Sequence, residues 1–203
     1  MSNHITPQKD LPAEQAKLPV TAVSIRCALS LFYYLMWADG QTSENEFETF
    51  DEIGSNLDPS FKDNRSEIIK SCYAQVKKVI DPEDRYDVLL EGVLEALRES
   101  APTEDSNMTP KLLLWNMLTV AYSDGECSAE ERRLIKAIVR QLDIDPAIFL
   151  EMESTILTLL DLEKELSWIK TTNRPYIVIE AMVNEIADRK EAIMQGVKAL
   201  ITL

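Results

Sequence analysis

A motif of eight residues occurs twice in this chain, and the second copy begins 85 residues after the first. Each copy has the form Asp-Gly-x-x-Ser-x-x-Glu. The two copies are Asp39, Gly40, Ser43 and Glu46, and then Asp124, Gly125, Ser128 and Glu131. Apolar positions after the motif also correspond, with Phe50, Ile53 and Leu57 matching Ile135, Ile138 and Leu142. Two matches in equivalent surroundings indicate an internal repeat. We therefore expect two related halves.

Apolar residues recur at three- and four-residue steps through most of the chain, which is the period of a helix. Glycine and proline residues interrupt this pattern and mark the boundaries between helices. Together they predict helices at about 21–40, 43–57, 66–80, 83–99, 109–122, 128–142, 146–159 and 177–201, with a short helical segment at 163–170. No useful stretch alternates with the period of a strand. The predicted fold class is all-α, a compact multi-helix bundle of about eight helices built from two related helix–DGxxSxxE–helix halves.

The motif itself fits the junction between two helices. Its glycine can supply the left-handed residue that closes one helix. Its serine can cap the start of the next helix, with the glutamate three residues later completing a capping box. Its aspartate would then occupy the last turn of the first helix, where the helix dipole disfavours an acid. Because this happens twice, the sequence suggests a further partner for Asp39 and Asp124, and a cation is the simplest one.

The same spacing resembles the latter half of an EF-hand loop, in which Asp, Gly and a bidentate Glu occupy the fifth, sixth and twelfth positions. The first half is missing, since its ligand positions hold Leu35 and Trp37 in one copy and Val120 and Tyr122 in the other. A true EF-hand is therefore excluded. What remains is a half-site of hard oxygen ligands that suits Ca²⁺ or Mg²⁺ better than Zn²⁺. The candidate metal ligands are Asp39, Glu46, Asp124 and Glu131, and helix capping alone is the competing interpretation.

Composition excludes several other functions. The 203 residues carry 35 Asp and Glu against 21 Lys and Arg, a formal net charge of -14. This charge argues against nucleic acid as a main partner and against electrostatic docking on an anionic membrane. The longest apolar run, about 12 residues, is too short to cross a bilayer. With no secretory signal visible, a cytoplasmic location and no direct membrane insertion are expected.

Catalytic and zinc sites also lack their usual residues. The single histidine, His4, lies in the polar amino-terminal stretch, so neither a Cys–His pair nor a Ser–His–Asp triad is expected inside the fold. The three cysteines, Cys27, Cys72 and Cys127, show no CxxC spacing. Cys127 lies within the second motif, but its acidic neighbours would not lower the pKa of its thiol. The sequence therefore predicts a protein that is not an enzyme, with no catalytic residues and no organic cofactor.

The doubled motif between paired helices resembles the TerB family, whose members are acidic, all-helical cytoplasmic proteins associated with tellurite resistance and chemical stress. The resemblance covers about residues 21–149 and is best at 31–57 and 112–145. It implies a helical domain of two related halves with an acidic, metal-associated site at the motifs. The expected organisation is a disordered leader at 1–19, a TerB-like helical domain at 20–148 and a carboxy-terminal helical extension at 149–203 packing on that domain.

Two functions remain open at this point. The first is a non-enzymatic, TerB-like stress protein that binds a divalent cation through Asp39, Glu46, Asp124 and Glu131. The second is a protein–protein interaction module in which the motifs are only helix caps and the acidic face docks a partner. The expected partners are another protein or a second copy of the chain, because the broad apolar side of the last helix must pack on the body or on another subunit. Trp37, Trp115 and Trp168 are expected in the core.

Overall fold

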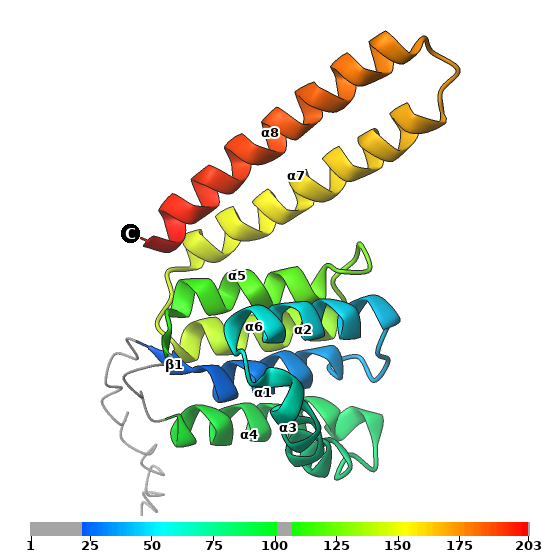
Figure 1. The fold of residues 1–203 in the computed structure, drawn as a ribbon. Helices are drawn as coiled ribbons and strands as arrows, with labels where there is room; N and C mark the ends of the chain where they lie inside the picture. The colour runs from blue at the N-terminus through cyan, green and yellow to red at the C-terminus, as the bar shows by residue number, and fades with distance from the viewer. Residues whose placement is uncertain (1–21, 101–106, 203) are drawn as a thin grey trace, which may run out of the picture.

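The computed structural model describes residues 22–100 and 107–202, so the predicted leader at 1–19 lies outside the described residues (Figure 1). Within them the chain forms eight α-helices and one pair of two-residue strands. The helices are α1 (Ile25–Met36), α2 (Glu44–Leu57), α3 (Phe61–Val76), α4 (Arg85–Glu99), α5 (Pro110–Ala121), α6 (Ala129–Gln141), α7 (Pro146–Thr171) and α8 (Tyr176–Thr202). A short 3₁₀ helix, η1, spans Pro82–Asp84. The predicted all-α class is confirmed.

Helix α1 lies at the centre of the body. It packs against α2, α3, α4, α5 and α6, and its buried residues include almost every side chain from Cys27 to Met36. The long apolar run in the sequence therefore has a structural explanation, because a helix enclosed on all sides is apolar all round. Among the described residues, no helix is both long and apolar enough to cross a membrane.

The short strands β1 (Val23–Ser24) and β2 (Asn107–Met108) pair antiparallel, with Val23 opposite Met108. The sequence predicted helix at residues 23 and 24, but α1 begins only at Ile25. Ser24 has extended backbone angles, and its hydroxyl accepts a hydrogen bond from the amide of Cys27, which makes it the N-cap of α1. The pairing ties the starts of α1 and α5 together, so the two helices that precede the motifs begin side by side.

Helix α3 begins and ends earlier than the pattern predicted, at Phe61 and Val76 instead of residues 66 and 80. Phe61 is buried and packs edge-to-face on Phe50 of α2, with ring centroids 5.6 Å apart. This contact anchors the first turn of α3. At the other end Ile80 is 97% exposed, so no packing extends the helix to it.

Helices α7 and α8 form a long antiparallel hairpin that projects from the body (Figure 1). The two helical segments predicted at 146–159 and 163–170 are one continuous helix, because Leu162 and Ile169 pack with Ile186 of α8 in a second apolar cluster. At its base the hairpin contacts α5, while its tip leaves Trp168 56% exposed. The expectation that Trp168 lies in the core is therefore wrong, whereas Trp37 and Trp115 do pack against the main core.

The α2–α3 contact gives a test of this packing. A methyl group added at Gly54 of α2 would lie 2.5 Å from the ring of Phe61, which is itself enclosed. We expect Gly54→Ala to lower the free energy of unfolding by about 1–3 kcal/mol through overpacking, as measured by urea denaturation.

Gly196→Ala is the matched control, since Gly196 is also helical and has open space where a methyl group would lie. It should raise stability by about 0.5–1 kcal/mol through helix propensity. Equal effects of the two substitutions would contradict the described α2–α3 packing.

Candidate metal centre

The first motif begins just after α1. The chain turns through Gly40, whose φ of 86° is in the left-handed region and whose amide donates to the carbonyl of Trp37 over 3.1 Å. Asp39 lies three residues beyond the helix end, and its Oδ1 accepts a hydrogen bond of 2.8 Å from the amide of Gln41. The sequence placed Asp39 in the last turn of the helix, and this was wrong. The partner found for one of its oxygens is the amide of the loop itself.

The second motif repeats this geometry after α5. Gly125 has a φ of 98°, and its amide donates to the carbonyl of Tyr122 over 3.0 Å. Asp124 lies three residues beyond Ala121, the last residue of α5, and its Oδ1 accepts from the amide of Glu126 over 3.1 Å. The equivalence of the two loops is therefore present in three dimensions as well as in the sequence.

Both motifs contain complete capping boxes. The Ser43 hydroxyl accepts from the Glu46 amide at 3.1 Å, while the Glu46 carboxylate accepts from the Ser43 amide at 2.6 Å. Ser128 and Glu131 form the same pair at 3.1 and 2.7 Å. The capping role predicted for the motifs is therefore confirmed. It occupies one oxygen of each glutamate.

The two capping glutamates are also the most buried acids of the motifs, each with 6% of its surface exposed. Burial raises the pKa of Glu46 above its ordinary value, and the charges of Asp124 and Asp39 raise it further, against the lowering effect of the hydrogen bonds from Ser43. Burial likewise raises the pKa of Glu131 to about 7, with Glu46 and Asp39 adding repulsion against the bonds from Ser128. The charges that add to these two rises in pKa come from both motifs, which places the acids of the two halves within electrostatic range of one another.

The packing of the two halves explains this proximity. Helices α1 and α5 begin side by side at the paired strands, have the same length and contact each other, so the loops that follow them lie at the same end of the bundle (Figure 1). Among residues 22–100 and 107–202, however, no three His, Cys, Asp or Glu side chains are gathered closely enough to hold a metal ion as they stand. A shared cation would require these side chains to leave their present rotamers.

Arg85 is a residue of this site that the sequence analysis missed. It comes from the start of α4, and its Nη1 donates to the carbonyl oxygen of Asp39 over 2.7 Å. Its guanidinium also covers Gly40, where an added Cβ would meet it at 2.4 Å. At Gly125 nothing lies within 4 Å of that position, so the second loop is open where the first is covered. No repeat or spacing links Arg85 to the motif, and only the tertiary structure identifies it.

Comparison with known families bears on this arrangement. The family model described as tellurite resistance protein TerB matches residues 26–153, which include both motifs, α1 from its second residue and the whole of α2 to α6. The chain belongs to the TerB family. No curated protein and no solved structure gives a significant match. The TerB match ends within α7, so most of the projecting hairpin is outside it.

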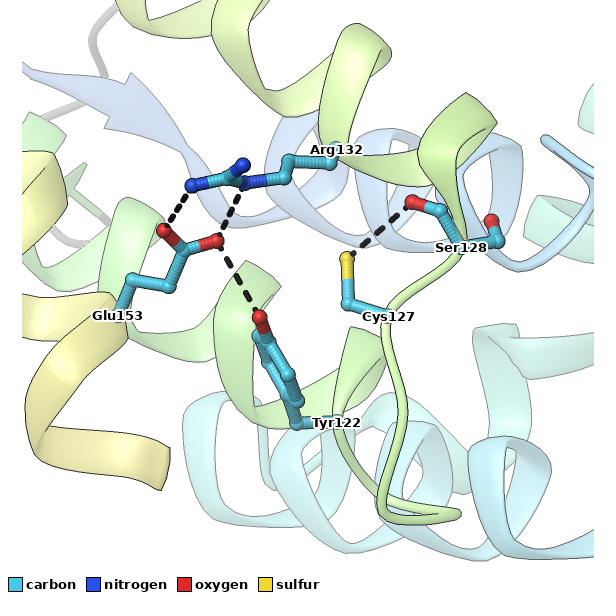
Figure 2. A network of polar contacts seen from close by, with 5 residues as sticks. All are labelled: Tyr122, Cys127, Ser128, Arg132 and Glu153. Atoms are coloured by element: carbon cyan, nitrogen blue, oxygen red, sulfur yellow. Dashed lines mark hydrogen bonds and ion pairs between the residues drawn. The ribbon is translucent and has the colours of Figure 1, made fainter. Parts of the chain in front are cut away.

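This TerB-family chain carries a second polar network beside the second motif (Figure 2). Glu153 of α7, which is 5% exposed, accepts hydrogen bonds from Arg132 Nε at 2.7 Å and Arg132 Nη2 at 2.5 Å. The hydroxyl of Tyr122 donates to the same carboxylate over 3.2 Å. The network ties α7 to the helices on both sides of the motif. The first motif has no counterpart, because the positions equivalent to Tyr122 and Arg132 are Trp37 and Phe47.

Cys127 lies beside this network, directly before Ser128 (Figure 2). Its Sγ donates to the carbonyl oxygen of Ser128 over 3.6 Å. Burial, together with the charges of Glu131 and Glu153, raises the pKa of its thiol to about 12. The thiol therefore stays protonated at neutral pH, and it lacks the thiolate character that nucleophilic chemistry or soft-metal binding requires.

The Arg132–Glu153 pair can be tested by removing one partner and then both. Arg132→Met leaves a buried carboxylate with only Tyr122 as a partner, so we expect the free energy of unfolding to fall by about 1–3 kcal/mol in urea denaturation. Arg132→Met combined with Glu153→Met should be more stable than Arg132→Met alone, since no buried charge is stranded. Arg133→Met, one residue along α6, is the control and should cost less than about 1 kcal/mol. Equal losses for the two arginines would contradict the structural role of this pair.

The raised pKa of Glu131 predicts a pH dependence of stability. Its pKa is 4.5 ordinarily and about 7 in the folded protein, so the folded state holds a proton that the unfolded state has released between those values. The free energy of unfolding should therefore fall as the pH rises from about 4.5 to about 7, then level off. In urea denaturation with chelator present, Glu131→Gln should gain stability relative to the parent across this range. Glu130→Gln, at an exposed position, is the control, and a parallel gain there would contradict the assignment to Glu131.

Proposed function

We propose that this TerB-family protein is a non-enzymatic, cation-binding protein of the tellurite and chemical stress response, and that its two motifs share one divalent cation. The single observation that carries the proposal is that the two capping glutamates, each 6% exposed, have pKa values raised by burial and, to a smaller extent, by the neighbouring acids of both motifs. Bringing several carboxylates close together in a half-buried site costs free energy unless a positive charge lies nearby. A cation bound between the loops would relieve that repulsion.

The ligands would be Asp39, Glu46, Asp124 and Glu131, which offer only carboxylate oxygens. Oxygen ligands of this kind favour Ca²⁺ or Mg²⁺ over Zn²⁺. The neighbouring Cys127 does not change this preference, since its thiol holds its proton. The role in tellurite or chemical stress is supported by the family match alone. The absence of enzymatic activity is proposed because the two glutamates of the site are engaged in capping, the two aspartates bond loop amides, and the neighbouring Cys127 thiol keeps its proton.

The competing function is an interaction module whose acidic face docks another protein. It is favoured by the complete capping boxes, which give the serines and glutamates a structural role without any metal. The two functions differ in what the aspartates do. As ligands they determine cation affinity, whereas in an interaction module they only bond the loop amides.

The deciding experiment uses Asp39→Asn combined with Asp124→Asn. Asparagine keeps the Oδ1 acceptor that bonds the loop amide in each motif, so the substitution removes charge and leaves the turn intact. In chelator-treated full-length protein, we expect calorimetric titration with Ca²⁺ or Mg²⁺ to give one binding event per chain. A thermal melt at 100 times the dissociation constant should show stabilisation of about 2.7 kcal/mol. The double variant should lose both signals.

The control removes two charges elsewhere, with Asp63→Asn combined with Asp188→Asn at exposed positions of α3 and α8. It should bind like the parent chain. Binding of no cation by the parent, or equal binding by both double variants, would refute the shared site and favour the interaction module. A stoichiometry of two would show that each motif acts alone.

A further inference from the structure

A basic groove lies along α6, in a protein whose overall charge is strongly negative. The groove has a cavity volume of about 520 Å³. Its lining residues come from α6 and, through one tyrosine, from α4, and they are Tyr86, Ala129, Arg132, Arg133, Lys136, Ala137 and Arg140. The lining thus contains four cationic side chains and no acid, although the chain as a whole has a formal charge of -14.

The spacing of these cations is unfavourable for the protein alone. Lys136 follows Arg132 by four residues and Arg133 by three, so it has two like charges on the preceding turn of the helix. Like charges at this spacing destabilise a helix by about 0.2–0.5 kcal/mol for each pair. A negatively charged ligand in the groove would offset this repulsion between the cations.

Two of the cations form no ion pair with an acid in the described part of the chain. Lys136 forms no ion pair with any described residue, and Arg133 is exposed and lies over the ring of Tyr86, with its Cζ 3.6 Å from the ring centroid. The stacking holds the guanidinium of Arg133 in a defined plane without consuming its charge. Arg132, by contrast, is held by Glu153, which fixes one wall of the groove.

The shape of the groove favours a small anion over a protein partner. Protein interfaces depend on a few large apolar or aromatic anchors. Among the described residues the exposed large apolar side chains lie elsewhere, at Tyr73 and Ile80 and on the α7–α8 hairpin. A long polyanion such as nucleic acid is opposed by the net charge of the chain. The small residues Ala129 and Ala137 leave a hollow, and Arg132, Lys136 and Arg140 follow one another at steps of about one helical turn, roughly 5.4 Å.

We propose that this groove binds a small ligand that carries at least two linked phosphate groups, with Arg133 and Lys136 contacting different phosphates. Arg133 presents a planar guanidinium suited to bidentate phosphate contacts, and Lys136 adds a point charge one turn further along. The site is separate from the proposed cation centre and does not depend on it.

The test is a calorimetric titration of the full chain with pyrophosphate and with tripolyphosphate, in chelator and low salt so that no cation–phosphate complex contributes. We expect saturable binding of both, tighter than that of orthophosphate or sulfate. Arg133→Gln combined with Lys136→Gln should weaken it by about a hundredfold, because each of the two lost charge-assisted bonds is worth about a factor of ten. Lys70→Gln combined with Lys198→Gln removes the same charge from exposed positions of α3 and α8 and should bind like the parent.

Two further arms identify the ligand. Tighter binding of ADP than of pyrophosphate would identify a nucleotide as the ligand. Equal binding of the two would identify the phosphate chain alone. Either result supports the proposal. No saturable binding, equal loss in both double variants, or equal affinity for sulfate would overturn it. So would tighter binding of an oligoglutamate peptide than of tripolyphosphate, which would identify an acidic protein segment as the occupant. Thermal melts of both double variants check that each retains its fold.

Discussion

The burial of α1 is the constraint on which the rest of the TerB body depends. Five helices pack around it, and nearly every side chain from Cys27 to Met36 is enclosed. A helix without a solvent-facing side must be surrounded, and here helices of both halves, α2 to α4 and α5 and α6, enclose it. Its carboxy-terminal end delivers the first motif to the place where α5 delivers the second. The meeting of the motifs is thus a consequence of core packing.

At that meeting point the same residues serve two purposes that oppose each other energetically. Glu46 and Glu131 stabilise the starts of α2 and α6 by bonding the amides of Ser43 and Ser128. The burial that makes those bonds effective also brings carboxylates of the two halves together and raises the pKa of both glutamates. Capping alone explains the bonds, but it does not require the two acids to be neighbours. The cation proposed for the site would offset the repulsion between the carboxylates of the two halves.

The two halves have diverged around this shared centre. In the first half, Arg85 covers Gly40 and binds the carbonyl of Asp39. In the second half the glycine is open, and Tyr122, Arg132 and Glu153 connect the motif to α7. Helix α6 therefore carries two acids in its first turn, the exposed Glu130 and the buried Glu131, and a row of basic side chains beyond them. Acidic and basic side chains are thus separated along the length of this helix.

The sequence by itself determined the helical class, the position of most helices, the repeat and the caps, because these depend on local periodicity and on bonds within a few residues. Only the tertiary structure decided that α7 is continuous, that Trp168 is exposed, and that Arg85 covers Gly40, since each depends on contacts between segments far apart in the chain. The candidate acids were found from their spacing, whereas their proximity across the halves was not. Local patterns record what a helix needs at its own ends, while the approach of two such ends is fixed by how the enclosed helix α1 is packed.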